Sequence, residues 1–338
     1  MQRISKTIRT LLIYSIATAL VGLVAPVVMP IAYAETVKNP APAGKKKAGK
    51  IVKVRRSAKA SVADFASDGG PNLLSHAALV FDQTTGRAIY AKNADSAMPI
   101  ASITKLMSAM VVLEARQNPD EPIVIESADV DTIKNSRSRL PVGTAFRRED
   151  LMRLALMASD NRAAAALGRT YPGGTAAFVE AMNNKAKLLG LNNSRFVDPT
   201  GLAPGNVASP QDLAVMVSAA SGFELIRTFS TAPALSVTLP HSGRQINFNN
   251  TNSLVKSDSW NIGLSKTGYI NEAGKCLVMQ VFIGTQPVVI VLMDSWGKFT
   301  RIGDANRIKK WIEGRKISVV PVPIAPATPA ASLSVKVI

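Results

Sequence analysis

The sequence predicts an α+β fold, in which a five-stranded antiparallel sheet is flanked by helices and accompanied by a mainly helical lobe. Strand patterns occur at both ends of the folded region, two of them near residue 80 and three between residues 264 and 293. The stretch between these ends spaces its apolar residues at helical intervals. Because short turns join the neighbouring strands, we expect antiparallel pairs in one sheet, with the helices inserted between its two parts.

The chain of 338 residues is 47% hydrophobic, which is enough to bury a large core in one or two domains. Its composition changes sharply outside that core. We predict four segments: a signal peptide (1–34), a basic disordered tether (35–71), a folded domain (72–314) and an unstructured Pro/Ala-rich tail (315–338).

The first segment has the three parts of a secretory signal peptide. Cations lie at positions 3, 6 and 9, and an apolar run follows over residues 11–31. The small-x-small triplet Ala32-Tyr33-Ala34 ends the run and provides a cleavage site. An uncleaved membrane anchor is the alternative, since the run is long enough to span a bilayer. Both interpretations place the body outside the cytoplasm, and we expect a periplasmic protein, free or loosely associated with membrane or wall.

The net charge of +17 is unevenly distributed. The signal peptide contributes +3 and residues 35–60 contribute +8, which leaves +6 for the rest of the chain. The basic character therefore belongs mainly to the tether, and we expect its Lys45–Lys59 stretch to contact anionic envelope polymers or lipid headgroups. Export argues against nucleic acid as a partner.

The folded domain begins with a predicted hairpin and a helix. Residues 76–82 and 87–91 have strand patterns, and a turn ending at Gly86 joins them. Apolar residues then recur at positions 100, 103, 106, 107 and 110, after Pro99, which suits a helix entrance. We expect this helix to end near Asn118.

The middle of the chain is predicted to be mainly helical. Glu149 and Asp150 begin one helix with favourable charges, Gly190 ends another as its C-cap, and Ser209 with Pro210 caps and starts a third. The predicted helices cover residues 151–158, 162–169, 175–189 and 210–220.

The last third returns to strands at residues 264–270, 276–283 and 287–293, and a helix over 301–312 closes the domain. The single cysteine, Cys276, excludes an internal disulfide and a cysteine-based metal cluster, and we expect it to be a buried strand residue.

The two histidines offer no metal site. His76 and His241 lie far apart in the sequence and lack a metal-ligand spacing. A serine–histidine triad has no motif support, and we expect His241 to lie in a turn.

A serine and a lysine stand three residues apart at the start of the first predicted helix, as Ser102 and Lys105. Residues i and i+3 share a helix face, so the two side chains can meet. An ammonium group in an apolar setting loses pKa and becomes a base, which a hydroxyl nucleophile requires. The motif alone is weak, because Ser-x-x-Lys also occurs at Ser253/Lys256 and Ser295/Lys298.

Two further motifs occur once each. Ser159-Asp160-Asn161 lies between helical runs, where a hydroxyl and an amide can point into a cleft, and Lys266-Thr267-Gly268 lies on a predicted strand. We expect Gly268 to let a ligand backbone pack closely against that strand. Each has an ordinary alternative, a helix cap and a turn respectively. Their order after Ser102, at intervals of 57 and 107 residues, favours one catalytic site.

At these residues the chain resembles the serine penicillin-recognising family, and most closely the low-molecular-mass penicillin-binding proteins of the D-alanyl-D-alanine endopeptidase/carboxypeptidase type. The resemblance covers roughly residues 72–314. It implies a β-lactamase/transpeptidase-like fold, peptidoglycan stem peptides and β-lactam antibiotics as ligands, and no metal or organic cofactor. The segments that carry it are 99–107, 160–164, 196–202 and 260–269.

The resemblance also implies roles for the first two motifs. Ser102 would attack the carbonyl of a D-Ala peptide bond and form an acyl-enzyme, with Lys105 as its base. Ser159 would relay a proton to the leaving amine. Asn161 would hold Lys105 and a substrate amide.

On the strand, Lys266 and Thr267 would bind the substrate carboxylate beside Gly268, and their positive potential would help to depress the pKa of Lys105. The backbone N–H groups of Ser102 and Tyr269 would form the oxyanion hole.

Three alternatives remain at this point. A class A β-lactamase needs an additional glutamate with a downstream Leu-Asn, which residues 194–202 lack, and Asp198 suits a turn instead. A catalytically idle wall-binding protein would use only the basic tether. A carboxypeptidase would remove terminal D-Ala from stem pentapeptides. Anchored carboxypeptidases usually add a β-rich domain and an amphipathic helix, whereas here the Pro-rich run Pro321–Pro329 follows, which favours the endopeptidase.

Overall fold

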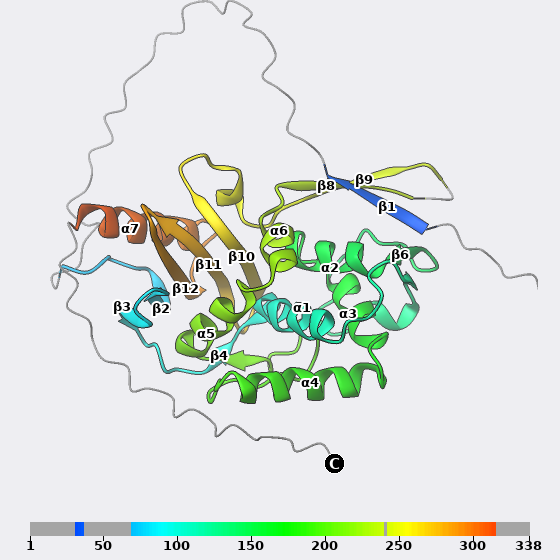
Figure 1. Cartoon of the computed structure of the whole chain (residues 1–338), viewed down its shortest axis with the longest axis horizontal. Helices are drawn as coiled ribbons and strands as arrows, with labels where there is room; N and C mark the ends of the chain where they lie inside the picture. The colour runs from blue at the N-terminus through cyan, green and yellow to red at the C-terminus, as the bar shows by residue number, and fades with distance from the viewer. Residues whose placement is uncertain (1–30, 37–68, 240–241, 316–338) are drawn as a thin grey trace, which may run out of the picture.

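The computed structural model describes residues 31–36, 69–239 and 242–315. Its main sheet has the strand order β10-β11-β12-β2-β3, and every pair in it is antiparallel, as predicted (Figure 1). Strands β2 and β3, from the start of the folded domain, therefore extend the sheet at the edge of β12, its last strand. The bounds are β2 Ser75–Asp82, β3 Arg87–Lys92, β10 Asn261–Ile270, β11 Gly274–Ile283 and β12 Gln286–Ser295.

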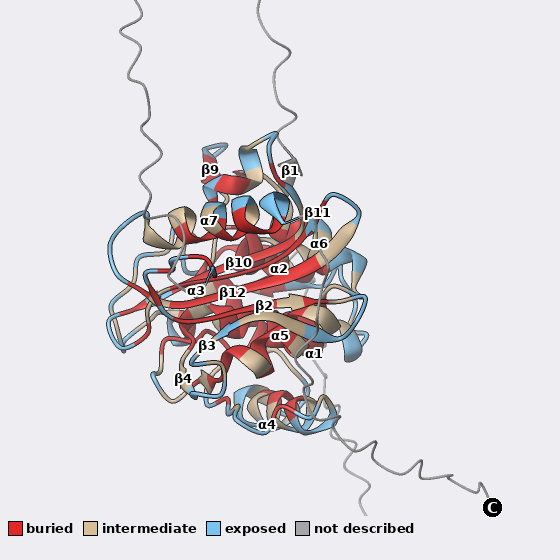
Figure 2. Cartoon of the chain, turned by 90° about the vertical axis from the view of Figure 1, so that its left-hand side faces the viewer, coloured by how far each residue is buried: buried red, intermediate tan, exposed pale blue. Residues whose placement is uncertain are grey.

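Both faces of this sheet are covered by helices, α5 (Pro210–Ala220) on one and α7 (Thr300–Gly314) on the other. Successive residues of β2 alternate between them: Leu79 packs into the cluster that contains α5, and Val80 into the cluster that contains α7. Two covered faces explain why the central strands are apolar throughout, and Figure 2 shows them buried between the helices.

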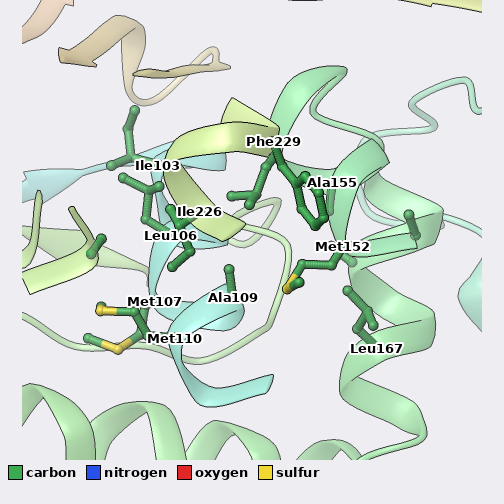
Figure 3. Packing of buried hydrophobic residues seen from close by; sticks show 14 of the residues in the cluster. Ile103, Leu106, Met107, Ala109, Met110, Met152, Ala155, Leu167, Ile226 and Phe229 are labelled. Carbon is green, nitrogen blue, oxygen red and sulfur yellow. The ribbon is translucent and has the colours of Figure 1, made fainter. Parts of the chain in front are cut away.

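The helical lobe packs around α1 (Thr104–Glu114), whose first nine residues are all buried. Leu106 and Met110 of α1 belong to one apolar cluster with Met152, Ile226 and Phe229 (Figure 3). Burying a leucine or methionine side chain contributes about 1.5–3 kcal/mol, so α1 is firmly fixed in the core. The other helices of the lobe are α2 Arg148–Met157, α3 Asn161–Arg169, α4 Gly174–Leu188 and α6 Glu224–Thr231.

The start and end of α1 differ from the prediction. Pro99 lies in the short strand β4 (Met98–Pro99), which pairs with β7 (Val207–Ala208), and the backbone N–H of Ile100 donates to the Asn206 carbonyl. This pairing keeps the chain extended up to the 3-10 turn η2 (Ala101–Ile103), from which α1 continues.

At its other end α1 stops at Glu114 rather than near Asn118. Arg116 has a left-handed φ of +49°, which interrupts the helical backbone there.

A second sheet, with the order β5-β6-β1-β8-β9, was not predicted. Its strand β1 pairs in parallel with β6 and antiparallel with β8. Strands of three to six residues leave little periodicity to detect, and α6 was missed in the same region. The bounds are β1 Ile31–Thr36, β5 Pro122–Val124, β6 Ala145–Arg147, β8 Ala234–Thr238 and β9 Gln245–Asn249.

Several local predictions are confirmed. The Ser209 side chain caps α5 by accepting from the Asp212 N–H, Gly190 follows α4 with φ +72°, and Cys276 is fully buried in β11. Burial also raises the pKa of the Cys276 thiol to about 11, as expected of an unreactive core residue. His241 lies outside the described residues, as do residues 316–338 of the predicted tail and most of the predicted signal peptide and tether.

Within the described residues, no single helix has the length and apolarity needed to cross a membrane. Helices α5 and α6 reach that standard only when counted together, although they are bent by 107° relative to each other.

Candidate active site

Ser102 lies in η2, directly after a residue with a left-handed backbone. Ala101 has φ +47°, and its carbonyl oxygen accepts a hydrogen bond of 2.7 Å from Thr104 Oγ1. Such a conformation persists only where the surroundings hold it in place. Gly201 packs directly against this backbone. A Cβ built on Gly201 would lie 1.9 Å from the Ala101 carbonyl oxygen, so only a glycine allows the approach. The backbone that positions Ser102 is therefore held by the loop around Gly201.

Gly201→Ala is expected to lower the free energy of unfolding by about 2–5 kcal/mol. An alanine adds about 1–2 kcal/mol for the left-handed φ and about 1–3 kcal/mol for the overlap with Ala101. Chemical denaturation measures the difference, with Gly86→Ala as the matched control. Gly86 also has a positive φ, +68°, but its Cβ would meet open space, so only the backbone cost should appear. Equal losses in the two variants would contradict the proposed packing.

Lys105 meets Ser102 as the three-residue spacing predicts. Its Nζ donates hydrogen bonds of 2.7 Å to Ser102 Oγ, to Asn161 Oδ1 and to the Thr200 carbonyl oxygen. The last two groups only accept, whereas the serine hydroxyl also donates. A neutral amine has two N–H donors and one lone pair. It can therefore keep both bonds to Asn161 and Thr200 while accepting the Ser102 proton.

Burial lowers the pKa of Lys105 from 10.5 to about 7. The side chain is 1% exposed, and its surroundings disfavour the charged form. The carboxylates of Asp198, Asp160 and Asp131 act in the opposite direction and raise the pKa. Burial, rather than the positive charge of Lys266 invoked from the sequence, is thus the leading cause of the low pKa. A base with this pKa is about half neutral at pH 7.

Ser159 and Asn161 lie at the start of α3, on either side of its N-cap Asp160. Ser159 has a left-handed φ of +58°, and its Oγ accepts a hydrogen bond of 2.8 Å from Lys266 Nζ. Asn161 accepts from Lys105 and donates through Nδ2 to Ser136 Oγ at 2.7 Å. Strained serine backbone next to a capped helix is typical of functional sites.

Lys266 lies in β10 and is as deeply buried as Lys105, with 1% exposure. Its Nζ donates to Ser159 Oγ and, at 2.9 Å, to the Thr267 carbonyl oxygen. Burial lowers the pKa of Lys266 well below its usual value, and the positive charges of Lys105 and Arg301 lower it further. Lys266 thereby connects the sheet to the Ser159 hydroxyl of the helical lobe.

Gly268 brings β10 against the backbone at Ser102. A Cβ on it would lie 2.8 Å from the Ile100 carbonyl oxygen and 3.2 Å from the Ser102 nitrogen. The sequence predicts that the missing side chain makes room for a ligand, but in the structure η2 and Ile100 occupy that space. Tyr269 is the next residue of β10, an edge strand of the main sheet, and it lines the same cavity as Ser102.

One cavity of about 400 Å³ collects most of the predicted residues, and the two lysines are buried below its wall. Two lining residues were missed from the sequence. Thr251 accepts a hydrogen bond of 2.6 Å from Thr267 Oγ1, and Arg301 of α7 donates to the Gly268 carbonyl oxygen at 3.4 Å. Neither lies in a motif, so only the fold brings them here. The lining residues are Ser102, Ser159, Asn161, Thr251, Thr267, Gly268, Tyr269 and Arg301.

The two other Ser-x-x-Lys matches are not assembled in this way. Lys256 donates to Asn249 Oδ1, and the Ser295 hydroxyl is hydrogen-bonded to that of Ser75 at 2.7 Å. Lys298 lies over the ring of Phe299.

Asp198 is a turn residue, as expected. Its carboxylate accepts from the backbone N–H groups of Thr200, Gly201 and Ala203, and this fixes the loop whose Thr200 carbonyl binds Lys105. The Asp198 carboxylate is thus bound to the backbone of its own loop, whereas the corresponding glutamate of a class A β-lactamase activates a water molecule.

A serine hydroxyl bonded to a buried lysine, with a second lysine on the edge strand of an antiparallel sheet, is the arrangement of the serine acyl-transfer enzymes of the penicillin-recognising class. The chain matches the model of peptidase family S11, D-alanyl-D-alanine carboxypeptidase, over residues 64–297. It belongs to that family.

Individual relatives agree with this assignment. The chain is 45% identical over 249 residues to a D-alanyl-D-alanine endopeptidase of Pseudomonas aeruginosa, an alignment that spans 74% of this chain and 80% of that protein. The crystal structure of the Streptomyces K15 DD-transpeptidase superposes with a TM-score of 0.67 at 28% identity, covering 72% of this chain and 99% of that one. Penicillin-binding protein D2 of Listeria monocytogenes, in its ampicillin-bound form, gives a TM-score of 0.60 at 30% identity, covering 71% and 97%.

Proposed function

We propose that this protein is a serine D-alanyl-D-alanine endopeptidase that cleaves the peptide cross-links of peptidoglycan through an acyl-enzyme on Ser102. The observation that carries the proposal is the 2.7 Å hydrogen bond between Ser102 Oγ and Lys105 Nζ, whose pKa of about 7 suits a base. The identity to an endopeptidase over most of both chains supports the choice of cross-links as substrate.

In the acylation step, neutral Lys105 takes the hydroxyl proton of Ser102 as Oγ attacks the carbonyl carbon of D-Ala. The backbone N–H groups of Ser102 and Tyr269 stabilise the resulting oxyanion, and losing one such donor typically costs about 10²–10³ in kcat. Lys105 then gives this proton to the leaving amine through the Ser159 hydroxyl, which Lys266 holds by its 2.8 Å hydrogen bond, and becomes neutral again. The C–N bond breaks and the acyl group stays on Ser102.

In the second step, water attacks the acyl-enzyme carbonyl and gives its proton to Lys105, which returns it to Ser102 Oγ as the ester bond breaks. Thr267 and Arg301 line the cavity, so a substrate carboxylate meets the Thr267 hydroxyl and the positive charge of Arg301. No step requires a metal or an organic cofactor.

Because Asp198 is committed to its loop, deacylation of a bound penicillin is expected to be slow. Intact-mass spectrometry should detect a penicilloyl adduct on Ser102 that persists for many minutes after excess drug is removed. Rapid turnover of penicillin without an adduct would instead favour a β-lactamase.

The alternative within the family is a carboxypeptidase, which is the activity that the family description names. The two differ in the leaving group, a cross-linked diamino acid or a free D-Ala. Purified cross-linked muropeptide dimers and pentapeptide monomers, digested in parallel by the full processed chain, distinguish them. We expect loss of dimers with little release of free D-Ala. Release of D-Ala from monomers with intact dimers would overturn the endopeptidase assignment.

We further propose that the protein acts in the periplasm and that its Lys45–Lys59 tether contacts anionic envelope polymer. The relatives are bacterial cell-wall peptidases, and the charge distribution supports such a contact. Cleavage after Ala34 would remove four of the six residues of β1 from the second sheet. N-terminal sequencing of the periplasmic protein tests this: an intact N-terminus in the membrane fraction would support the anchor.

A further inference from the structure

We propose that the end of the main sheet beside the active-site cavity is a platform for the sugar strand that carries the scissile stem peptide. The aromatic platform, as we call it, consists of Tyr269, Lys275, Trp296 and Phe299. Tyr269 pairs with Lys275 across β10 and β11, and Lys275 pairs with Ser295 across β11 and β12. Three neighbouring strands therefore bring this row together, and Trp296 follows it immediately. This inference rests on the proposed function.

The platform is continuous with the active site. A second cavity, of about 430 Å³, is lined by Tyr269, Lys275 and Trp296, and Tyr269 also lines the cavity that contains Ser102. A polymer bound at the nucleophile and extending past Tyr269 would therefore reach Trp296 without leaving the protein surface.

Its aromatic side chains face solvent to an unusual degree. Trp296 is 89% exposed, Phe299 69% and Tyr269 55%. Among the described residues, no hydrogen bond or ring contact engages the Trp296 indole. Large apolar side chains gathered at one exposed place mark a binding surface rather than a contribution to the fold.

The charges beside these rings are mostly positive. Lys275 Nζ lies 4.5 Å from the centre of the Tyr269 ring, and Lys298 Nζ lies 5.3 Å from that of Phe299. Asp294 is the acid in this cavity, whereas Glu272 of the neighbouring turn is paired with Lys134 at 2.5 Å. Exposed aromatic rings with cations beside them match a sugar ring that bears an acidic peptide.

Trp296→Ala should therefore separate polymer binding from chemistry. We expect kcat/KM on cross-linked dimers that retain their disaccharides to fall about tenfold, chiefly through KM, a loss at the low end of that for removing an aromatic side chain on which a nucleic-acid base stacks. The acylation rate with a fluorescent penicillin and the cleavage of sugar-free peptide dimers should change less than twofold. Phe282→Ala, at the opposite end of β11, is the matched control and should behave as wild type.

Two results would overturn the platform: no fall with the sugar-bearing dimer, or an equal fall with all three substrates. If the wild type cleaves neither dimer, the proposed function fails, and co-sedimentation with insoluble peptidoglycan tests the platform alone. In about 1 M salt, which screens the basic tether, Trp296→Ala should reduce retention about tenfold. Unchanged retention would overturn the inference.

Discussion

Ser102→Ala is expected to abolish both covalent penicillin labelling and cross-link cleavage, with a loss of about 10⁴–10⁶ in kcat. The variant removes the oxygen that forms the acyl bond, and loss of a catalytic serine has effects of this size in other serine hydrolases. The measurements are intact mass after incubation with penicillin and the digestion of muropeptide dimers. The Ser102 side chain is only partly buried, so the fold and its unfolding midpoint should change little.

Ser253→Ala is the matched control, because Ser253 belongs to another Ser-x-x-Lys motif but lies exposed in the 3-10 turn η4 (Ser253–Lys256). It should label and cleave as the wild type does. If Ser102→Ala kept its cell-wall effects unchanged, the protein would act as a wall-binding protein and not as an enzyme.

Lys105→Arg is expected to lower the rate of acylation by about 10²–10⁴, the range associated with loss of a general base. Arginine keeps the positive charge but stays protonated at any pH the protein tolerates, so it cannot accept the Ser102 proton. Stopped-flow acylation by a fluorescent penicillin measures the effect. Lys92→Arg is the control, since Lys92 also donates to two backbone carbonyls, those of Leu73 and Ser75, away from the cavity.

The rate of acylation by the fluorescent penicillin should also depend on pH. Burial lowers the pKa of Lys105 to about 7, so its neutral, basic form is scarce below that pH and dominant above it. The wild-type acylation rate should therefore rise with pH and reach half its maximum near pH 7. Lys105→Arg should show no such rise. A wild-type profile that falls through pH 7 would mean that the charged ammonium is the active form.

The strands of the main sheet could be predicted from local sequence pattern. These five strands are long, apolar and mostly joined by short turns, and their bounds in the structure differ from the prediction by only a few residues.

The position of Pro99, in contrast, could not be predicted from local pattern. A proline before an apolar helical run suits a helix entrance, yet pairing with Val207 and Ala208 keeps it in a strand. That partner lies about a hundred residues away, where no local rule can detect it.

In the candidate active site, too, some features follow from local sequence and others from the fold. The three motifs and their order can be identified in the chain alone, and so can the Ser102–Lys105 contact, because it is local to one helical turn. The apolar helix and the motif order already favoured the Ser102–Lys105 pair, but the depth of burial that brings the Lys105 pKa to about 7 comes from the fold.

The fold also places Thr251 and Arg301 in the cavity and packs Gly268 against η2. The physical reason is that burial, electrostatic environment and close packing depend on residues far apart in the chain. A rule based on sequence spacing can predict contacts only between residues that lie close together in the sequence.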